Sequence, residues 1–186
     1  MSNQKDQALV ELISEKDDRE ALKILIERYQ APLERYLLRI GVNNHDCDDV
    51  LQNTMIKMYI NINSYNELKG TFSSWLYRIT HNEAQSFFKK NKRSLTVDDE
   101  TWWEAIKSDE DLGESANNSQ LKGAISTALN KLNQKYSEPL TLHFLEGKSY
   151  QEIGYILKIP TSTVGVRINR GKAKLKVTLK QWKGDA

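Results

Sequence analysis

The sequence lacks the features of secreted and membrane proteins. It has a single cysteine, Cys47, in 186 residues, so no internal disulfide can form, as expected in a reducing cytoplasm. It contains no run of about 20 apolar residues, the length that a membrane-spanning helix requires. Residues 1–6 are polar and do not resemble the apolar core of a signal peptide. We therefore predict a cytoplasmic protein with no membrane insertion.

Patterns typical of enzymes are also missing. There is no glycine-rich phosphate loop and no arrangement that supports a serine or cysteine nucleophile. Residues 45–49 (His-Asp-Cys-Asp-Asp) include metal-ligand types, but their spacing fits no zinc site, and a helix start explains the acids. The acidic triplet 98–100 lacks the accompanying histidine or lysine residues of a two-metal nuclease. We predict no enzymatic activity, no metal and no cofactor.

Charge is present but strongly segregated. The formal net charge is only +2. Residues 158–183 nevertheless contain eight lysines and arginines and no acid, whereas residues 98–114 contain eight acids and one lysine. Local charge, rather than net charge, decides what a surface attracts.

Nearly all of the remaining sequence has helical periodicity. Apolar residues between Leu22 and Ile40 recur at three- and four-residue spacing. Asp17 or Asp18 is expected to cap the start of this helix, and Gly41 follows its end. Pro32 is expected to bend or interrupt it, because proline lacks an amide donor.

Two further helices are expected in the N-terminal half, over residues 46–62 and 72–93, separated by a loop. Residues 94–119 are acidic and have no sustained apolar period, apart from the pair Trp102-Trp103. We interpret them as a linker. An amphipathic helix should follow near residues 121–132, and another from Glu138-Pro139 to Gly147. The predicted fold is all-α, with two small helical domains, 1–93 and 120–186, joined by an acidic flexible linker.

The C-terminal end has the pattern of a helix-turn-helix. Ser149 and Glu152 form a capping box at the start of a short helix. Residues 158–160 (Lys-Ile-Pro) make the turn. In the next helix Val164 and Ile168 can be buried, while an opposite face carries Thr163, Val166, Arg167, Arg170 and Lys174. A helix that lies in the DNA major groove requires this division, since arginine can bind guanine with two donors and lysine neutralises phosphates.

The helix expected over residues 72–93 also combines aromatic and basic residues. Trp75, Tyr77 and the pair Phe87-Phe88 alternate with cations, and the helix ends in Lys89-Lys90-Asn91-Lys92-Arg93. Aromatic rings can stack on unpaired bases while cations follow the backbone. An ordinary amphipathic helix with a basic end is the alternative.

Two blocks of this sequence resemble a known family. Residues 49–53 (Asp-Val-Leu-Gln-Asn) and 72–79 (Phe-Ser-Ser-Trp-Leu-Tyr-Arg-Ile) resemble region 2 of a bacterial extracytoplasmic-function (ECF) sigma factor. Residues 146–153 and the helix after them resemble region 4, and the resemblance covers about residues 18–180. It implies a dissociable RNA polymerase subunit, with region 2 melting and reading the −10 element and region 4 reading the −35 element as duplex.

The resemblance also implies site residues. The surface docking on the clamp coiled coil of the largest core subunit would carry Asp49, Gln52, Asn53 and Lys57. Asn53 stands where the family usually has glutamate, so this face has one charge fewer. The −10 element would be read or held by Asn66, Thr71, Trp75, Arg78, Asn82, Ser86, Lys89, Lys90 and Arg93. The −35 element would be read by Thr163, Val166, Arg167, Asn169, Arg170 and Lys174. Gly165 replaces a usual lysine or arginine, which removes one DNA contact.

The implied partners are core RNA polymerase, promoter DNA and an anti-sigma factor. Three other functions compete with this one. A stand-alone helix-turn-helix regulator would bind promoter duplex tightly without the polymerase, commonly as a dimer. A DNA-cleaving enzyme would need acids beside the basic helices, where only Glu83 is found. A protein-binding module without a DNA role does not explain the uniformly basic last helix.

Overall fold

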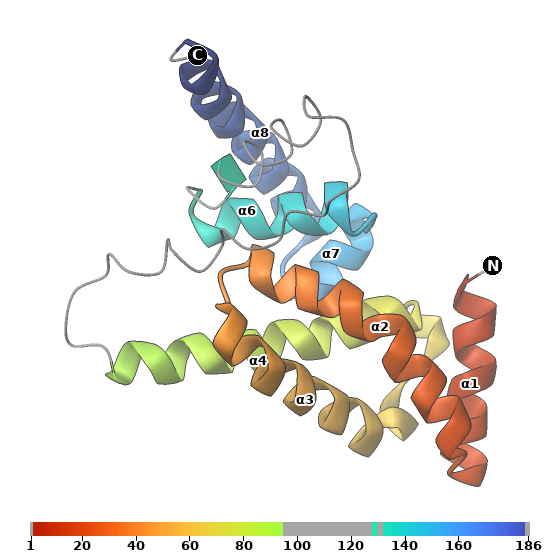
Figure 1. The fold of residues 1–186 in the computed structure, drawn as a ribbon. Coiled ribbons are helices and arrows are strands. Elements are labelled where there is room, and N and C mark those ends of the chain that lie inside the picture. Colours follow the sequence, from red (N-terminus) through yellow and green to blue (C-terminus); the bar gives the residue numbers. More distant parts are fainter. Residues whose placement is uncertain (1, 95–127, 130–131, 185–186) are drawn as a thin grey trace.

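The computed structural model describes residues 2–94, 128–129 and 132–184, and every regular element within them is a helix. These helices form two groups, α1–α4 and α6–α8, stacked on one another (Figure 1). The predicted all-α class with two small helical domains is therefore confirmed. Residues 95–119 of the expected linker, with Trp102 and Trp103, lie outside the described residues.

Helix α2 (Arg19–Arg39) begins where its cap was predicted. The Asp18 carboxylate accepts from the amides of Glu20 and Ala21, at 3.0 and 3.1 Å. Pro32 was expected to bend or interrupt this helix, but it does not interrupt it, and α2 continues through Pro32 to Arg39. Leu33 and Tyr36, the residues that follow on the inner side, have no exposed surface. Their burial offsets the missing backbone hydrogen bond of the proline.

Helix α1 (Ser2–Lys16) was not predicted. Val10 and Ile13 are buried against the other helices of the group. Asp6 is also buried, and its carboxylate accepts from Arg28 and, at 2.6 Å, from the Tyr29 hydroxyl. The sequence did carry a cue, since apolar residues recur at three- and four-residue spacing from residue 9 to residue 13.

Helix α3 (Asn44–Ile60) begins two residues earlier than expected because the Asn43 side chain accepts from the Asp46 amide at 2.9 Å. Cys47 lies inside, where burial first and the carboxylates of Glu34 and Asp48 second raise the pKa of its thiol to about 11. The thiol is therefore poorly ionised at neutral pH and poorly reactive.

An aromatic cluster joins the loop after α3 to helix α4 (Phe72–Ser94). The short 3-10 helices η1 (Ile62–Ser64) and η2 (Glu67–Lys69) lie in this loop. Phe72 has no exposed surface, and its ring centroid lies 5.6 Å from Tyr29, 5.5 Å from Tyr65 and 5.6 Å from Trp75. The start of α4 is thus fixed by packing on two sides.

The second group differs from the expectation at its start. Helix α6 (Gln134–Leu140) begins at Gln134, capped by Asn133, and not at Glu138. Pro139 therefore lies near the end of α6 and not in a first turn, and the π-helix η4 (Thr141–Leu145) continues the chain. Of the helix expected before it, residues 121–127 and 130–131 lie outside the described residues.

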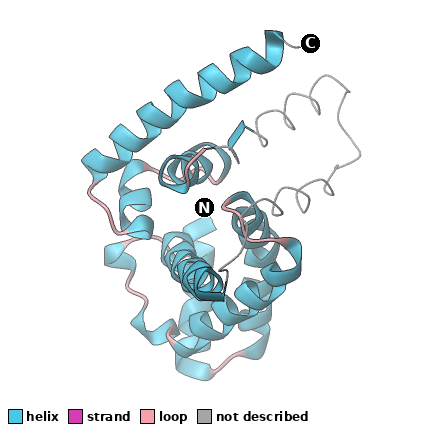
Figure 2. Cartoon of the chain, turned by 90° about the vertical axis from the view of Figure 1, so that its left-hand side faces the viewer, coloured by secondary structure: helices cyan, strands magenta, loops and turns pink. Residues whose placement is uncertain are grey.

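Helices α7 (Tyr150–Leu157) and α8 (Thr161–Gly184) complete the second group. Helix α7 lies between α4 and α8 and contacts both. A view turned by 90° shows the same two groups, with the group of α6–α8 above that of α1–α4 (Figure 2). Among the described helices, we find none whose length and apolar character would let it span a bilayer.

Candidate nucleic-acid interface

The outward face of α3 carries the four residues expected to dock on the polymerase. Asp49, Gln52, Asn53 and Lys57 are all exposed, on the side opposite the buried residues of the helix. Lys57 also pairs with Glu83 of α4, with 2.5 Å between Nζ and Oε1. Its ammonium group thus connects this face to the next helix.

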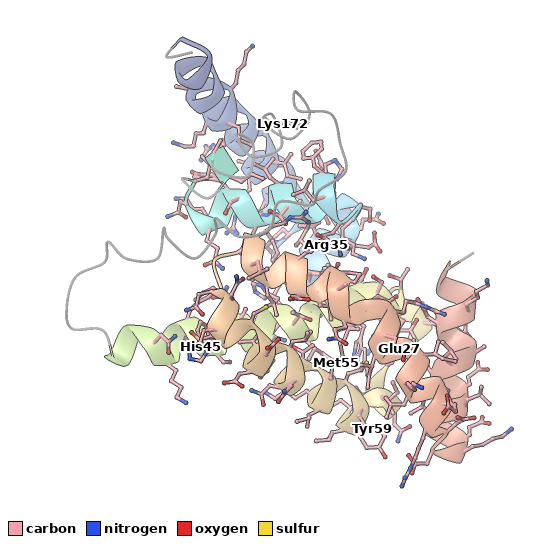
Figure 3. All side chains as sticks on the ribbon, in the orientation of Figure 1. Glu27, Arg35, His45, Met55, Tyr59 and Lys172 are labelled. Carbon is pink, nitrogen blue, oxygen red and sulfur yellow. The ribbon has the colours of Figure 1, made fainter. Side chains whose placement is uncertain are left out.

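Sequence reasoning missed the apolar part of the α3 face. Ile56 and Ile60 are 55% and 69% exposed, although they lie in a helix whose other side forms the core. Tyr59 is also exposed and lies at the far end of α3, where its hydroxyl donates to Asp17 at 2.7 Å (Figure 3). The sequence offered one cue, because Ile56 and Ile60 share a helix face with the polar residues Gln52 and Asn53. Apolar side chains on such a face indicate a contact outside the helix.

A hollow of about 520 Å³ lies between the loop after α3, helix α4 and helix α7. Four residues of the predicted −10 set line it: Asn66, Trp75, Arg78 and Asn82. Lys69 also lines it and belongs to the loop, residues 66–71, that was expected to hold an unstacked base. The other lining residues were not predicted for this site: Lys57, Asn61, Ser64, Ile79, Glu83 and Tyr155. The hollow combines amide, cationic and aromatic groups, which suit an unstacked base and its phosphate.

The loop that forms one wall of the hollow is held by local contacts. The Asn66 side chain accepts from the Leu68 amide at 2.9 Å and caps η2. Gly70 has φ of +152°, a conformation that residues with a side chain rarely adopt. Leu68 is 90% exposed at the tip. The loop therefore has a defined shape and presents its polar groups toward the hollow.

Other members of the predicted −10 set lie elsewhere. Thr71 does not line the hollow, and its hydroxyl donates to Glu152 at 3.1 Å. Ser86, Lys89 and Lys90 are exposed further along α4, and the side chain of Arg93 lies outside the described residues. The interpretation of Tyr77 as a base-stacking ring is not met in this arrangement. Tyr77 is 3% exposed and donates to Glu146 at 2.6 Å.

Tyr155 is the lining residue that sequence reasoning could not have found. It comes from α7, in the second helix group, and the Arg78 guanidinium lies 4.4 Å from the centre of its ring. This is cation–π geometry. No local pattern around residue 155 indicates it, because the contact depends on how the two groups are placed.

The helix-turn-helix has the predicted cap and turn. The Ser149 amide donates to Glu152 Oε2 at 2.9 Å, and the Glu152 amide donates to Ser149 Oγ at 3.2 Å. Lys158 ends α7 in the left-handed conformation, with φ of +56°. A Cβ on Gly154 would lie 2.9 Å from the Ile159 carbonyl oxygen. The close approach of the turn to α7 therefore requires glycine at that position.

Helix α8 separates its two faces as expected. Val164 and Ile168 have no exposed surface. On the other side Val166 is 49% exposed, and its neighbours in the predicted −35 set are exposed or half-buried: Thr163, Arg167, Asn169, Arg170 and Lys174. The six residues share an outward surface of one straight helix, the arrangement a major-groove reader requires.

We predict opposite stability effects for alanine at two glycines of this motif. Gly165→Ala should stabilise the protein by up to about 1 kcal/mol, because alanine favours the helix and a Cβ there meets only the Tyr150 ring, at 3.7 Å. Gly154→Ala should destabilise it by about 1–3 kcal/mol, because backbone must move. Urea unfolding of both variants measures the difference. Equal effects would show that the close contact at Gly154 does not limit the turn.

Comparisons with known proteins agree with this arrangement. The Sigma-70 region 2 model matches residues 25–94, and the Sigma-70, region 4 model matches residues 122–175. The ECF RNA polymerase sigma factor SigW of Bacillus subtilis (strain 168) is 32% identical over 173 residues, 89% of this chain and 92% of the relative.

Two solved structures share the fold. CnrH, in complex with the cytosolic domain of CnrY, has a TM-score of 0.69 at 21% identity and covers 95% of this chain and 98% of its own. RpoE from Bartonella quintana, in complex with the anti-sigma factor NepR, has a TM-score of 0.69 at 20% identity. That match covers 85% of this chain and 96% of RpoE.

Proposed function

This chain belongs to the extracytoplasmic-function sigma factors of bacterial RNA polymerase, and on that premise we propose that three of its surfaces divide the work of promoter-directed transcription initiation. Family membership removes the stand-alone regulator considered above. In the proposed division, residues 1–93 bind the polymerase and the −10 element, residues 94–119 link the domains, and residues 120–186 bind the −35 element.

The outward face of α3 is the proposed binding surface for the largest core subunit. Asp49, Gln52, Asn53 and Lys57 supply its polar part. The exposed side chains of Ile56 and Ile60 supply an apolar centre, which protein interfaces commonly have. A polar face with two exposed isoleucines is better explained by a partner than by solvent.

The hollow beside α4 is the observation that carries the DNA-binding proposal. Arg78 and Asn82 project from consecutive turns of α4 and meet Asn66 from the loop, so a flipped base can be bound from two sides. Lys89 and Lys90 extend a basic line along the same helix. The α8 face would read the −35 duplex through direct base contacts and phosphate contacts.

Regulation and location follow from the same premise. The similar RpoE structure contains an anti-sigma factor, and we propose that this chain is also controlled by one. Its proposed site of action is the cytoplasm, where the polymerase and the chromosome are found. We propose no catalytic activity for the chain itself, since the polymerase performs the chemistry.

Transcription in vitro tests this proposal. Purified core RNA polymerase is combined with the protein and a pooled library of genomic fragments, and the RNA start sites are mapped. Start sites that require both proteins are expected, and they reveal the promoter sequence. The absence of both core-dependent transcripts and co-elution with core would contradict the proposal.

A matched pair of variants tests the polymerase surface separately. Ile56→Asp should reduce co-elution with core at least tenfold, because a charge would be buried at the centre of the interface. Ile24→Asp makes the same change on a different helix, at a side chain of α2 that is 41% exposed. Equal co-elution of the two variants would place the polymerase contact elsewhere.

A further inference from the structure

One residue that lines the hollow has a charge opposite to that of its neighbours. The cations of the hollow are Lys57, Lys69 and Arg78. Glu83 is the only acid that lines it in the part of the chain that the structure describes. The phosphate backbone of DNA is an anion, so a carboxylate in this place weakens the attraction of the site for the backbone. The presence of Glu83 therefore requires an explanation other than phosphate binding.

The position of Glu83 on α4 places it beside the groups proposed to bind a base. Arg78 and Asn82 are four residues apart on this helix. Ile79 and Glu83 have the same spacing. Residues four apart lie one above the other on a helix, so the two pairs form neighbouring rows. All four residues line the hollow, and the carboxylate of Glu83 thus borders the same space as the Arg78 guanidinium.

Lys57 of α3 binds one oxygen of this carboxylate. Its Nζ atom lies 2.5 Å from Glu83 Oε1, the distance of a charge-assisted hydrogen bond. The side chain of Glu83 is only 12% exposed, whereas that of Lys57 is 52% exposed. An ion pair with so exposed a partner adds little to stability. Its main effect is to hold the carboxylate in one orientation at the wall of the hollow.

The hollow contains many hydrogen-bond donors and few strong acceptors. Lysine and arginine side chains can only donate. The side-chain oxygen of Asn66 already accepts from the Leu68 amide at 2.9 Å. Among the described lining residues, only Glu83 offers an acceptor with a negative charge. A base bound in the hollow should therefore present a donor toward Glu83 and acceptors toward the cations.

The four bases differ in how well they meet this requirement. Cytosine and adenine carry an amino group, which donates, next to a ring nitrogen that accepts. Thymine has a carbonyl oxygen in place of that amino group, so a carboxylate beside it would bring two acceptors together. Guanine offers two donors side by side, which need both carboxylate oxygens, and Lys57 already binds Oε1. The hollow therefore fits cytosine or adenine better than thymine or guanine.

We propose that Glu83 is a specificity-determining residue of the hollow: its carboxylate, held by Lys57, accepts from the amino group of an unstacked cytosine or adenine and disfavours thymine at that position. This role rests on the proposed function, which identifies the hollow as the −10 site. It adds the chemical class of the bound base and assigns its selection to a residue of α4.

Deaminated DNA strands test the role of Glu83. The probes are the two labelled single strands of the −10 element of a promoter mapped by transcription, and they are bound by core polymerase in complex with the full chain. In a set of variant strands, each cytosine in turn is replaced by uracil and each adenine by hypoxanthine. Both replacements exchange the amino group for a carbonyl oxygen. At one position the replacement should weaken binding by about tenfold to a hundredfold, the usual value of a specific base contact, and that position identifies the base.

Two variants of Glu83 and one control assign this penalty. The amide of Glu83→Gln can accept or donate, and Glu83→Ala has no acceptor, so the penalty should fall below about threefold in both. Glu67→Gln is the matched control. It also removes a negative charge from the loop beside the hollow, but Glu67 is exposed and does not line it. Its penalty should equal that of the wild type.

The ratio of two affinities separates base selection from an indirect effect. If Glu83 only pairs with Lys57, its substitution changes the affinity for every strand by the same factor. The ratio between the unmodified and the deaminated strand then stays the same. An unchanged ratio in both Glu83 variants, or the lack of a sensitive position in the wild-type complex, would overturn the role of Glu83. Co-elution with core checks that each variant still binds the polymerase.

Failure of the proposed function has a different signature. If no core-dependent promoter is found, or if the wild-type complex binds neither unmodified strand, the hollow is not a −10 site and the role of Glu83 fails with it. Binding of an unmodified strand without any penalty for deamination leaves the −10 site in place and removes only the selection by Glu83.

Discussion

Phe72→Ala should destabilise the first helix group by about 3–5 kcal/mol, the largest stability effect that we expect from a single substitution. Phe72 has no exposed surface and contacts the rings of Tyr29, Tyr65 and Trp75. Its removal leaves a cavity where the loop after α3 joins α4. Because the same ring holds the wall of the hollow, −10 DNA binding should weaken with stability.

Urea unfolding followed by circular dichroism measures this change. Phe144→Ala is the matched control, because Phe144 of η4 is 54% exposed and its ring lies 4.8 Å from the Lys172 ammonium group, so its loss should alter stability by no more than about 1 kcal/mol. Similar midpoints for the two variants would mean that the aromatic cluster does not support the first group.

Arg78→Ala should reduce core-dependent transcription from a mapped promoter by about tenfold to a hundredfold. The guanidinium in the hollow can bind a base edge or a phosphate, and such contacts are each worth about 1–3 kcal/mol. The same substitution also removes the contact with the Tyr155 ring, whose centre lies 4.4 Å from the guanidinium.

Arg19→Ala is the control for charge, since Arg19 is exposed at the start of α2 and does not line the hollow. Transcription and binding of a single strand spanning the −10 element are measured for both variants. Binding of −35 duplex should be the same for both. Equal transcription by the two variants would exclude Arg78 from −10 binding.

Local features of the fold were readable from the sequence. The Ser149 and Glu152 capping box and the Asp18 cap each depend on residues within one turn of each other, and both appear as predicted. The start of α6 was missed because a proline was assigned to a first turn by its usual preference, whereas Asn133 provides the cap. Helix α1 was missed because its first turn is polar and its apolar residues come only later in the helix.

The residues that line the hollow could be predicted only in part, because some of them depend on long-range packing. Spacing along one helix places Arg78 and Asn82 on one face, but it cannot show that Ser86 lies beyond the hollow or that Thr71 turns toward Glu152. Tyr155 lies more than 70 residues after Arg78 in the sequence, so only the packing of the two helix groups brings it to the hollow. The common outward position of the six residues on α8 could be predicted more fully, because a single helix carries all of them.

The carboxylates between the helix groups limit how far the two halves can be exchanged between relatives. A hybrid that joins α1–α4 of this chain to the DNA-reading half of another sigma factor would bring the hydroxyls of Tyr36 and Tyr77 against a foreign surface. Without acids at the positions of Glu138 and Glu146, those hydroxyls would lose their acceptors. Hybrids built for new promoter specificity should therefore transfer these acids with the reading helix, so that the buried hydroxyls keep their acceptors.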